Sequence, residues 1–65
     1  MSTEEKVWEL CSTATFFGVD DKRGNPNAVC EVYESEELDA KVLGEGDTYE
    51  EAWQNALKNL KSIKA

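Results

Sequence analysis

The clearest pattern in the chain is a stretch near its C-terminus where apolar residues recur at steps of three and four. This spacing puts them on one face of a helix and predicts a helix over residues 49–63. The apolar face is expected to hold Tyr49, Ala52, Trp53, Ala56, Leu57, Leu60 and Ile63, and the polar face Glu50, Glu51, Gln54, Asn55, Lys58, Lys61 and Lys64. Thr48 and Glu51 match a capping box, in which the hydroxyl accepts from an early helix amide and the carboxylate accepts from the amide of the cap residue. The helix is therefore expected to begin directly after Thr48.

Three stretches before this helix alternate in the manner of β-strands. Residues 7–19 are rich in β-branched and aromatic side chains and predict a first strand. Its core face is expected to hold Trp8, Leu10, Ala14 and Phe16, and its other face Glu9, Cys11, Thr13, Thr15 and Phe17. Residues 28–34 predict a second strand with Ala28, Cys30 and Val32 opposite Val29, Glu31 and Tyr33. Residues 38–43 predict a third, with Leu38, Ala40 and Val42 opposite Asp39, Lys41 and Leu43.

The order of these elements predicts an α+β fold. Asp, Gly, Asn and Pro26 in residues 18–27 favour a long hairpin loop, and an acidic turn at residues 35–37 joins the next two strands. We expect a single domain, residues 1–65, with a two-layer β-β-β-α architecture: a three-stranded antiparallel meander with one C-terminal helix packed on one face. The other face is a candidate dimer or partner surface formed by Cys11, Phe17, Val29, Tyr33 and Leu43. Alternatively, Phe17 and Tyr33 only cover neighbouring strands or fold under the long loop.

Charge is distributed unevenly along the chain and narrows the choice of partner. The 65 residues are 40% hydrophobic and carry a net charge of -7, with all 14 acids and 4 bases in residues 1–51 and three lysines after them. Phosphate binding needs clustered Lys and Arg, so we expect no direct nucleic-acid binding. The three lysines suit the C-terminal end of a helix macrodipole. A domain this small buries only about 60% of its unfolded surface, so self-association would help its stability.

The residue types present do not indicate catalysis. The chain has no histidine, the commonest general base. Cys11 and Cys30 have no imidazole partner and match no zinc pattern; they are either buried thiols or a cross-strand disulfide. Asp20 and Asp21 lack the ligand spacing of a calcium loop. We therefore expect a non-enzymatic protein without metal or cofactor. A polar N-terminus and the lack of a long apolar run predict a cytoplasmic protein with no membrane contact.

The segment that precedes and opens the helix resembles a known family. Gly46-Asp47-Thr48-Tyr49-Glu50-Glu51-Ala52, continued by Asn55-Ala56 and Leu60, is similar to a motif that follows the sheet in HicB-type antitoxins. Their N-terminal domain is a small β-β-β-α unit related in shape to double-stranded RNA-binding domains. The family's Pro-Gly turn before the motif is missing, and no DNA-binding segment follows Ala65, so we expect no repressor activity. RNA-binding domains of this shape carry lysines at the helix start, where this chain has Tyr49, Glu50 and Glu51. The resemblance implies the scaffold and a basic protein partner, without an RNA site.

These observations predict a small acidic module for protein–protein interaction. It would bind a basic partner, as an antitoxin-like or phage-borne inhibitor does, because charge complementarity speeds encounter. Residues 31–51 carry nine acids and one base, and the candidate partner-binding residues are Glu31, Glu34, Glu36, Glu37, Asp39, Glu45 and Asp47. The same acids alternatively confer only solubility and protect sheet edges. Two other functions remain open: a structural homodimer or assembly component that uses the exposed sheet face, and a nucleic-acid mimic that inhibits a DNA- or RNA-binding enzyme.

Overall fold

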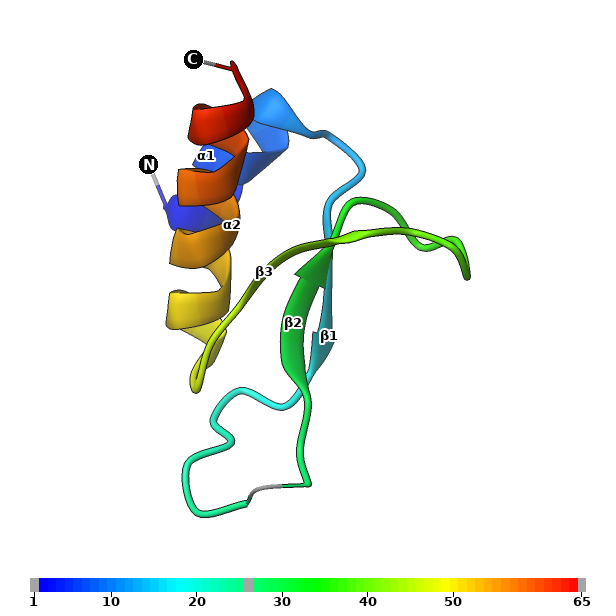
Figure 1. Cartoon of the computed structure of the whole chain (residues 1–65). Coiled ribbons are helices and arrows are strands. Elements are labelled where there is room, and N and C mark those ends of the chain that lie inside the picture. The colour runs from blue at the N-terminus through cyan, green and yellow to red at the C-terminus, as the bar shows by residue number, and fades with distance from the viewer. Residues whose placement is uncertain (1, 26, 65) are drawn as a thin grey trace.

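The chain folds into a three-stranded antiparallel sheet followed by a long helix, with a short helix in front of the sheet. The computed structural model describes the backbone of residues 2–25 and 27–64 and the side chains of residues 2–25 and 27–62. Its elements are α1 (Thr3–Leu10), β1 (Thr15–Gly18), β2 (Cys30–Tyr33), β3 (Val42–Glu45) and α2 (Tyr49–Lys64) (Figure 1). The predicted turn role of Pro26 and the predicted helix faces of Ile63 and Lys64 lie outside these residues. The α+β class with a meander and a C-terminal helix is confirmed.

The predicted C-terminal helix is confirmed together with its apolar face. Ala52, Trp53, Ala56 and Leu60 are buried, and the described residues of the polar face are exposed. The Glu51 amide donates to Thr48 Oγ1 at 3.2 Å, as expected of a cap. The Glu51 carboxylate, however, accepts from the amide of Asp47 at 3.0 Å, one residue before the amide that the capping box predicted.

The strands are ordered β1-β2-β3, so β2 is central and β3 lies at an edge. Cys30 and Val32 of β2 are buried while Glu31 and Tyr33 are half-buried, which confirms the predicted alternation of this strand. Both helices lie on the same side of the sheet (Figure 1). Gly18 ends β1 with φ 120°, and a Cβ there would overlap the backbone carbonyl of Val29, so only glycine fits this close approach.

The prediction of one strand over residues 7–19 is wrong in its first half, which forms α1. Ser2 caps this helix: its hydroxyl accepts from the Glu5 amide at 3.3 Å and donates to the Glu5 carboxylate at 3.3 Å. Val7 is buried, with Leu10 and Cys11 packed against the core from the same helical face. Trp8, expected in the core, is instead 43% exposed. Burial of a helical face thus overrides the β-propensity of this segment.

The third strand begins later than predicted, and its side chains face the opposite sides of the sheet from those predicted. Leu38 lies in the β2–β3 loop and is fully exposed, while Val42 is exposed and Leu43 is buried. Val32 pairs with Gly44 and Tyr33 with Val42, so Leu43 is the extra residue of a β-bulge. The bulge turns both Leu43 and Gly44 toward the helices, which breaks strict alternation.

The core lies between the sheet and the two helices and centres on Trp53. Trp53 is 1% exposed and lies edge-on to Trp8 and Tyr49, with ring centroids 5.4 and 6.0 Å away. The buried apolar set is Val7, Ala14, Cys30, Val32, Leu43, Ala52, Trp53, Ala56 and Leu60. Because this set faces only one side of the sheet, the opposite side is left for other contacts.

Candidate functional site

The side of the sheet turned away from the helices forms the free face, which consists of Thr15, Phe17, Glu31, Tyr33, Val42 and Glu45. The register places these side chains together: Thr15 opposite Tyr33, Phe17 opposite Glu31, Glu31 opposite Glu45, and Tyr33 opposite Val42. Phe17 is 60% exposed and Val42 is 45% exposed. Neither helix of the described residues covers these apolar groups, so the free face is the strongest candidate for an interaction surface.

The rings on the free face are held in place by local contacts. Phe17 and Tyr33 pack edge to face, with ring centroids 6.2 Å apart and an interplanar angle of 87°. The Tyr33 hydroxyl donates to Glu31 Oε1 at 2.9 Å. This hydrogen bond to a carboxylate opposes loss of the hydroxyl proton and raises the pKa of Tyr33. The face therefore presents aromatic rings and a carboxylate in a fixed arrangement.

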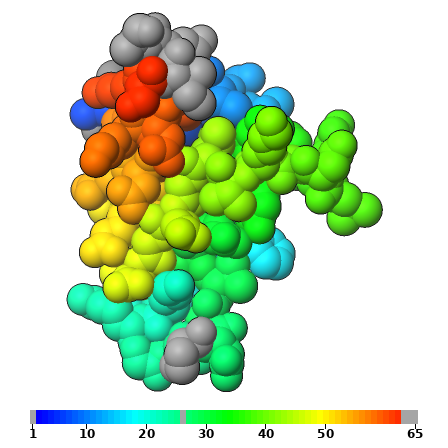
Figure 2. All heavy atoms as spheres, in the orientation of Figure 1, coloured from blue at the N-terminus to red at the C-terminus, as the bar shows by residue number. Residues whose placement is uncertain are grey.

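The β2–β3 loop projects from the body of the molecule beside this face (Figures 1 and 2). Its base is fixed because the Glu34 amide donates to the Lys41 carbonyl at 3.0 Å, and its turn is fixed because the Ala40 amide donates to the Glu37 carbonyl at 3.2 Å. Ser35 Oγ accepts from the Glu37 amide at 3.3 Å. A groove of about 360 Å³ lies between the loop and the face and is lined by Thr15, Phe17, Tyr33, Ser35, Glu36, Glu37 and Leu38.

The structure places the predicted acidic residues in three locations. Glu31 and Glu45 face each other on the free face, and Glu34, Glu36, Glu37 and Asp39 lie in or beside the β2–β3 loop. Asp47 lies at the opposite end of β3, where its carbonyl accepts from the Lys22 amide at 2.8 Å. The length of β3 therefore separates Asp47 from the acids of the β2–β3 loop, although Asp47 comes only two residues after Glu45.

The structure places only some of the residues of the predicted dimer face on the free face. Phe17 and Tyr33 lie on the free face, and Val29, just before β2, is exposed. Leu43 is in the core because of the bulge. Cys11 follows α1 and is half-buried, with its Sγ donating to the Glu34 carbonyl at 3.5 Å. Sequence reasoning missed Leu38 and Val42; the lone leucine in an acidic turn was a usable signal for the former.

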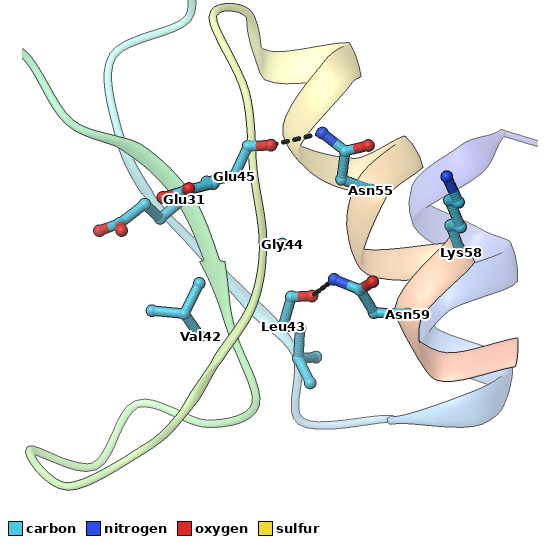
Figure 3. A pocket seen from close by; sticks show the side chains of 8 residues that line it. All are labelled: Glu31, Val42, Leu43, Gly44, Glu45, Asn55, Lys58 and Asn59. Atoms are coloured by element: carbon cyan, nitrogen blue, oxygen red, sulfur yellow. Dashed lines mark hydrogen bonds between the residues drawn. The ribbon is translucent and has the colours of Figure 1, made fainter. Parts of the chain in front are cut away.

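A second groove of about 450 Å³ runs along the edge strand, between the free face and α2 (Figure 3). Asn59 Nδ2 donates to the Leu43 carbonyl at 2.6 Å, and Asn55 Nδ2 donates to the Glu45 carbonyl. A Cβ on Gly44 would overlap the backbone of Ala56, so α2 and β3 touch between these two bonds. The asparagine amides thus occupy acceptor groups of an edge strand that a further strand would otherwise use. Two asparagines four residues apart on a helix were the signal for this role.

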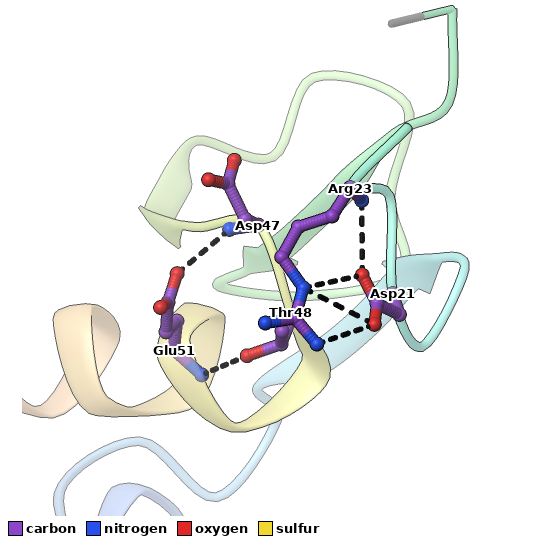
Figure 4. Close-up of polar contacts among 5 residues, drawn as sticks. All are labelled: Asp21, Arg23, Asp47, Thr48 and Glu51. Atoms are coloured by element: carbon purple, nitrogen blue, oxygen red, sulfur yellow. Dashed lines mark hydrogen bonds and ion pairs between the residues drawn. The ribbon is translucent and has the colours of Figure 1, made fainter. Parts of the chain in front are cut away.

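The long β1–β2 loop is tied to the start of α2 (Figure 4). The Tyr49 amide donates to the Asp20 carbonyl at 2.6 Å, which satisfies one free amide of the first helical turn. Arg23 pairs with Asp21, with Nη2 and Oδ2 2.7 Å apart. Hydrogen bonds from the Arg23 side chain and amide lower the pKa of Asp21 to about 2, from an ordinary 3.8. The carboxylates of Asp21 and Glu51 at this end therefore have partners within the chain.

The Cys30 thiol and the Tyr49 hydroxyl lie in surroundings that disfavour their ionised forms. Cys11 and Cys30 are both free thiols, so the disulfide alternative is not formed. Burial raises the pKa of the Cys30 thiol, which disfavours the reactive thiolate. Burial likewise raises the pKa of Tyr49. Across residues 2–25 and 27–64, no cluster of His, Cys, Asp and Glu is arranged to hold a metal ion.

Comparisons with protein-family models, with curated proteins and with solved structures find no match to this chain. Within the described residues, neither helix combines the length and the apolar character needed to cross a bilayer. The geometry of the free face and the β2–β3 loop therefore provides the basis for a functional proposal.

Proposed function

We propose that this chain is a non-enzymatic interaction module that binds a basic protein partner through the free face and the β2–β3 loop. The observation that supports this is the combination of exposed apolar groups with carboxylates on one surface. Phe17, Leu38 and Val42 provide the apolar contacts. Glu36 and Glu37 at the groove make no ion pair with another described residue. An apolar centre with a charged rim is the usual anatomy of a protein interface.

Charge favours a different protein over a second copy as the occupant. Within residues 31–51 the only base is Lys41, against nine acids. Pairing of two copies through this surface would bring carboxylates against carboxylates, and like charges across an interface cost several kcal/mol. A basic partner would gain from the same charges. An antitoxin-like or phage-borne inhibitor, the role that the HicB resemblance implies, is a module of this kind.

The proposal is tested with a defined probe, a peptide of alternating lysine and leucine, titrated into the isotope-labelled chain. We expect amide shifts on β1, β2 and the β2–β3 loop, with weaker affinity at higher salt because charge contributes. The double variant E36Q/E37Q should bind more weakly. The matched control is E5Q/E9Q, which removes two exposed charges from α1, where glutamine can still accept from the Ser2 hydroxyl.

The two variants separate a specific surface from general attraction to an acidic protein. Equal weakening by E36Q/E37Q and E5Q/E9Q, or shifts spread over α1 and α2, would contradict the proposal. Circular dichroism of both variants checks that the fold is kept, which we expect because Glu5, Glu9, Glu36 and Glu37 are all exposed.

A further inference from the structure

The groove between the free face and the β2–β3 loop has the chemistry to select one kind of basic side chain. This step rests on the proposed function and concerns the partner's anchor residue. Its lining joins two aromatic side chains of the sheet, Phe17 and Tyr33, here called the aromatic floor, with two loop residues, Glu36 and Glu37, here called the lip. Leu38 also lines the groove and is fully exposed. A side chain that enters must therefore satisfy an apolar floor and negative charges together.

The aromatic floor is exposed and preorganised. Phe17 retains 60% of its accessible surface, and its edge-to-face contact with Tyr33 leaves ring surface open to the groove. The Tyr33 hydroxyl is already bonded to Glu31, so it does not need a new partner when a ligand binds. A cation over such a ring is attracted by the ring quadrupole.

The carboxylates at the lip are available to a ligand. The turn that carries Glu36 and Glu37 is held by backbone bonds and by Ser35, while their side chains are exposed. The one ion pair found among the described residues, Asp21 with Arg23, belongs to the β1–β2 loop. No internal cation has to be displaced from the lip.

We infer that the groove binds an arginine side chain of the basic partner, with its guanidinium stacked on the aromatic floor and its N–H groups directed to the carboxylates. The guanidinium is planar, weakly hydrated and able to bond a carboxylate in a bidentate manner. A lysine ammonium is a compact, strongly hydrated charge and gains less from the rings. A purely apolar side chain would desolvate Glu36 and Glu37 without compensation.

The test compares an arginine-rich peptide with the same peptide carrying lysine at every arginine position. Both are titrated into the full chain, and amide shifts at Phe17, Tyr33 and Leu38 are followed. We expect the arginine peptide to bind about two- to five-fold more tightly, the range that corresponds to one exposed cation–π contact. The variant F17L should lose this preference, and F17Y should keep it. Because Phe17 is an exposed residue, both variants are expected to fold.

The possible results distinguish this inference from the proposed function. Equal binding of both peptides at the free face would overturn the arginine anchor and leave the basic partner standing. Loss of all binding at that face would overturn both. An arginine preference that persists in F17L would also overturn the inference, because the ring would then not be the selecting group.

Discussion

Trp53 is the largest fully buried side chain among the described residues, and it shows how much one residue contributes to a core this small. It is 1% exposed, whereas its neighbour Trp8 is 43% exposed and donates through Nε1 to the Ala14 carbonyl at 2.9 Å. We expect W53A to lose about 3–5 kcal/mol, a large share of the stability of a small domain. W8A should lose clearly less. Urea unfolding followed by circular dichroism measures both, and similar losses would contradict the central position of Trp53.

Asp21 offers a second prediction at this scale, because its pKa depends on one neighbour. Arg23 lowers the pKa of Asp21 to about 2, so the folded state favours the carboxylate. The resulting contribution to stability is present above the ordinary value of 3.8 and is lost as the pH falls through about 2. The variant R23Q should raise the pKa of Asp21 toward 3.8, and K22Q should leave it unchanged. Titration of the Asp21 carboxyl carbon by NMR reports the value; no change in R23Q would exclude the ion pair.

At the scale of elements, α2 covers the edge of the sheet, and Asn59 offers a test of this contact. N59A removes the donor to the Leu43 carbonyl, which should cost about 0.5–1.5 kcal/mol. It also exposes an acceptor on the edge strand, so we expect self-association that grows with concentration. The matched control is Q54A, since Gln54 is exposed and bonds only the Glu50 side chain. Melting curves and light scattering test both effects, and equal behaviour of the variants would show that Asn59 does not protect the edge.

The elements that could be predicted from sequence were those specified by local signals. The helix behind Thr48 has a cap and a long apolar face, and both are present in the structure. The helix over Thr3–Leu10 was missed although Ser2 and Glu5 match the same capping signal. An isolated helix of this length is marginal in water, and it is stabilised by packing on α2, which no local pattern shows.

The third strand could not be predicted correctly from local pattern, because a β-bulge decides which of its side chains face the core. Alternation alone put Val42 in the core and Leu43 outside. The bulge at Leu43 reverses this assignment. A bulge is set by the partner strand and by the close contact of Gly44 with α2, and both are tertiary. The acids of the candidate site, together with Phe17 and Tyr33, could therefore be predicted from the sequence. The complete set of residues that form the site could not.

On the scale of the whole molecule, the two sides of the sheet differ in what covers them. The helices bury one side, and the edge strand is covered by asparagine amides from α2. The ion pair of Asp21 with Arg23 lies where the β1–β2 loop meets α2 (Figure 4). Glu36 and Glu37, whose side chains are exposed, lie on the β2–β3 loop, which projects from the body of the molecule (Figure 2). A partner is therefore expected to approach the loop and the free face from one direction.

The excess of acids should also make the stability of the whole fold depend on ionic strength. The chain carries 14 acids against 7 bases within a radius of gyration of 11.2 Å. The Debye length is about 30 Å at 0.01 M salt, longer than this radius, and about 3 Å at 1 M. Repulsion across the molecule therefore acts fully at low salt and is screened at high salt. We expect Tm to rise with sodium chloride, where each ~1 kcal/mol gained corresponds to about 4–8 °C for a domain of this size.

The variant E36Q/E37Q should show a shallower dependence of Tm on salt, because it removes two of the unengaged charges. R23Q serves as the opposite control, since it removes a base and should steepen the dependence. Chloride is the suitable anion, because sulfate strengthens apolar burial by a separate route. A Tm that falls with sodium chloride would mean that attractive pairs, such as Asp21 with Arg23, outweigh the repulsion. In that case the charges of the chain would stabilise the fold on balance at low salt.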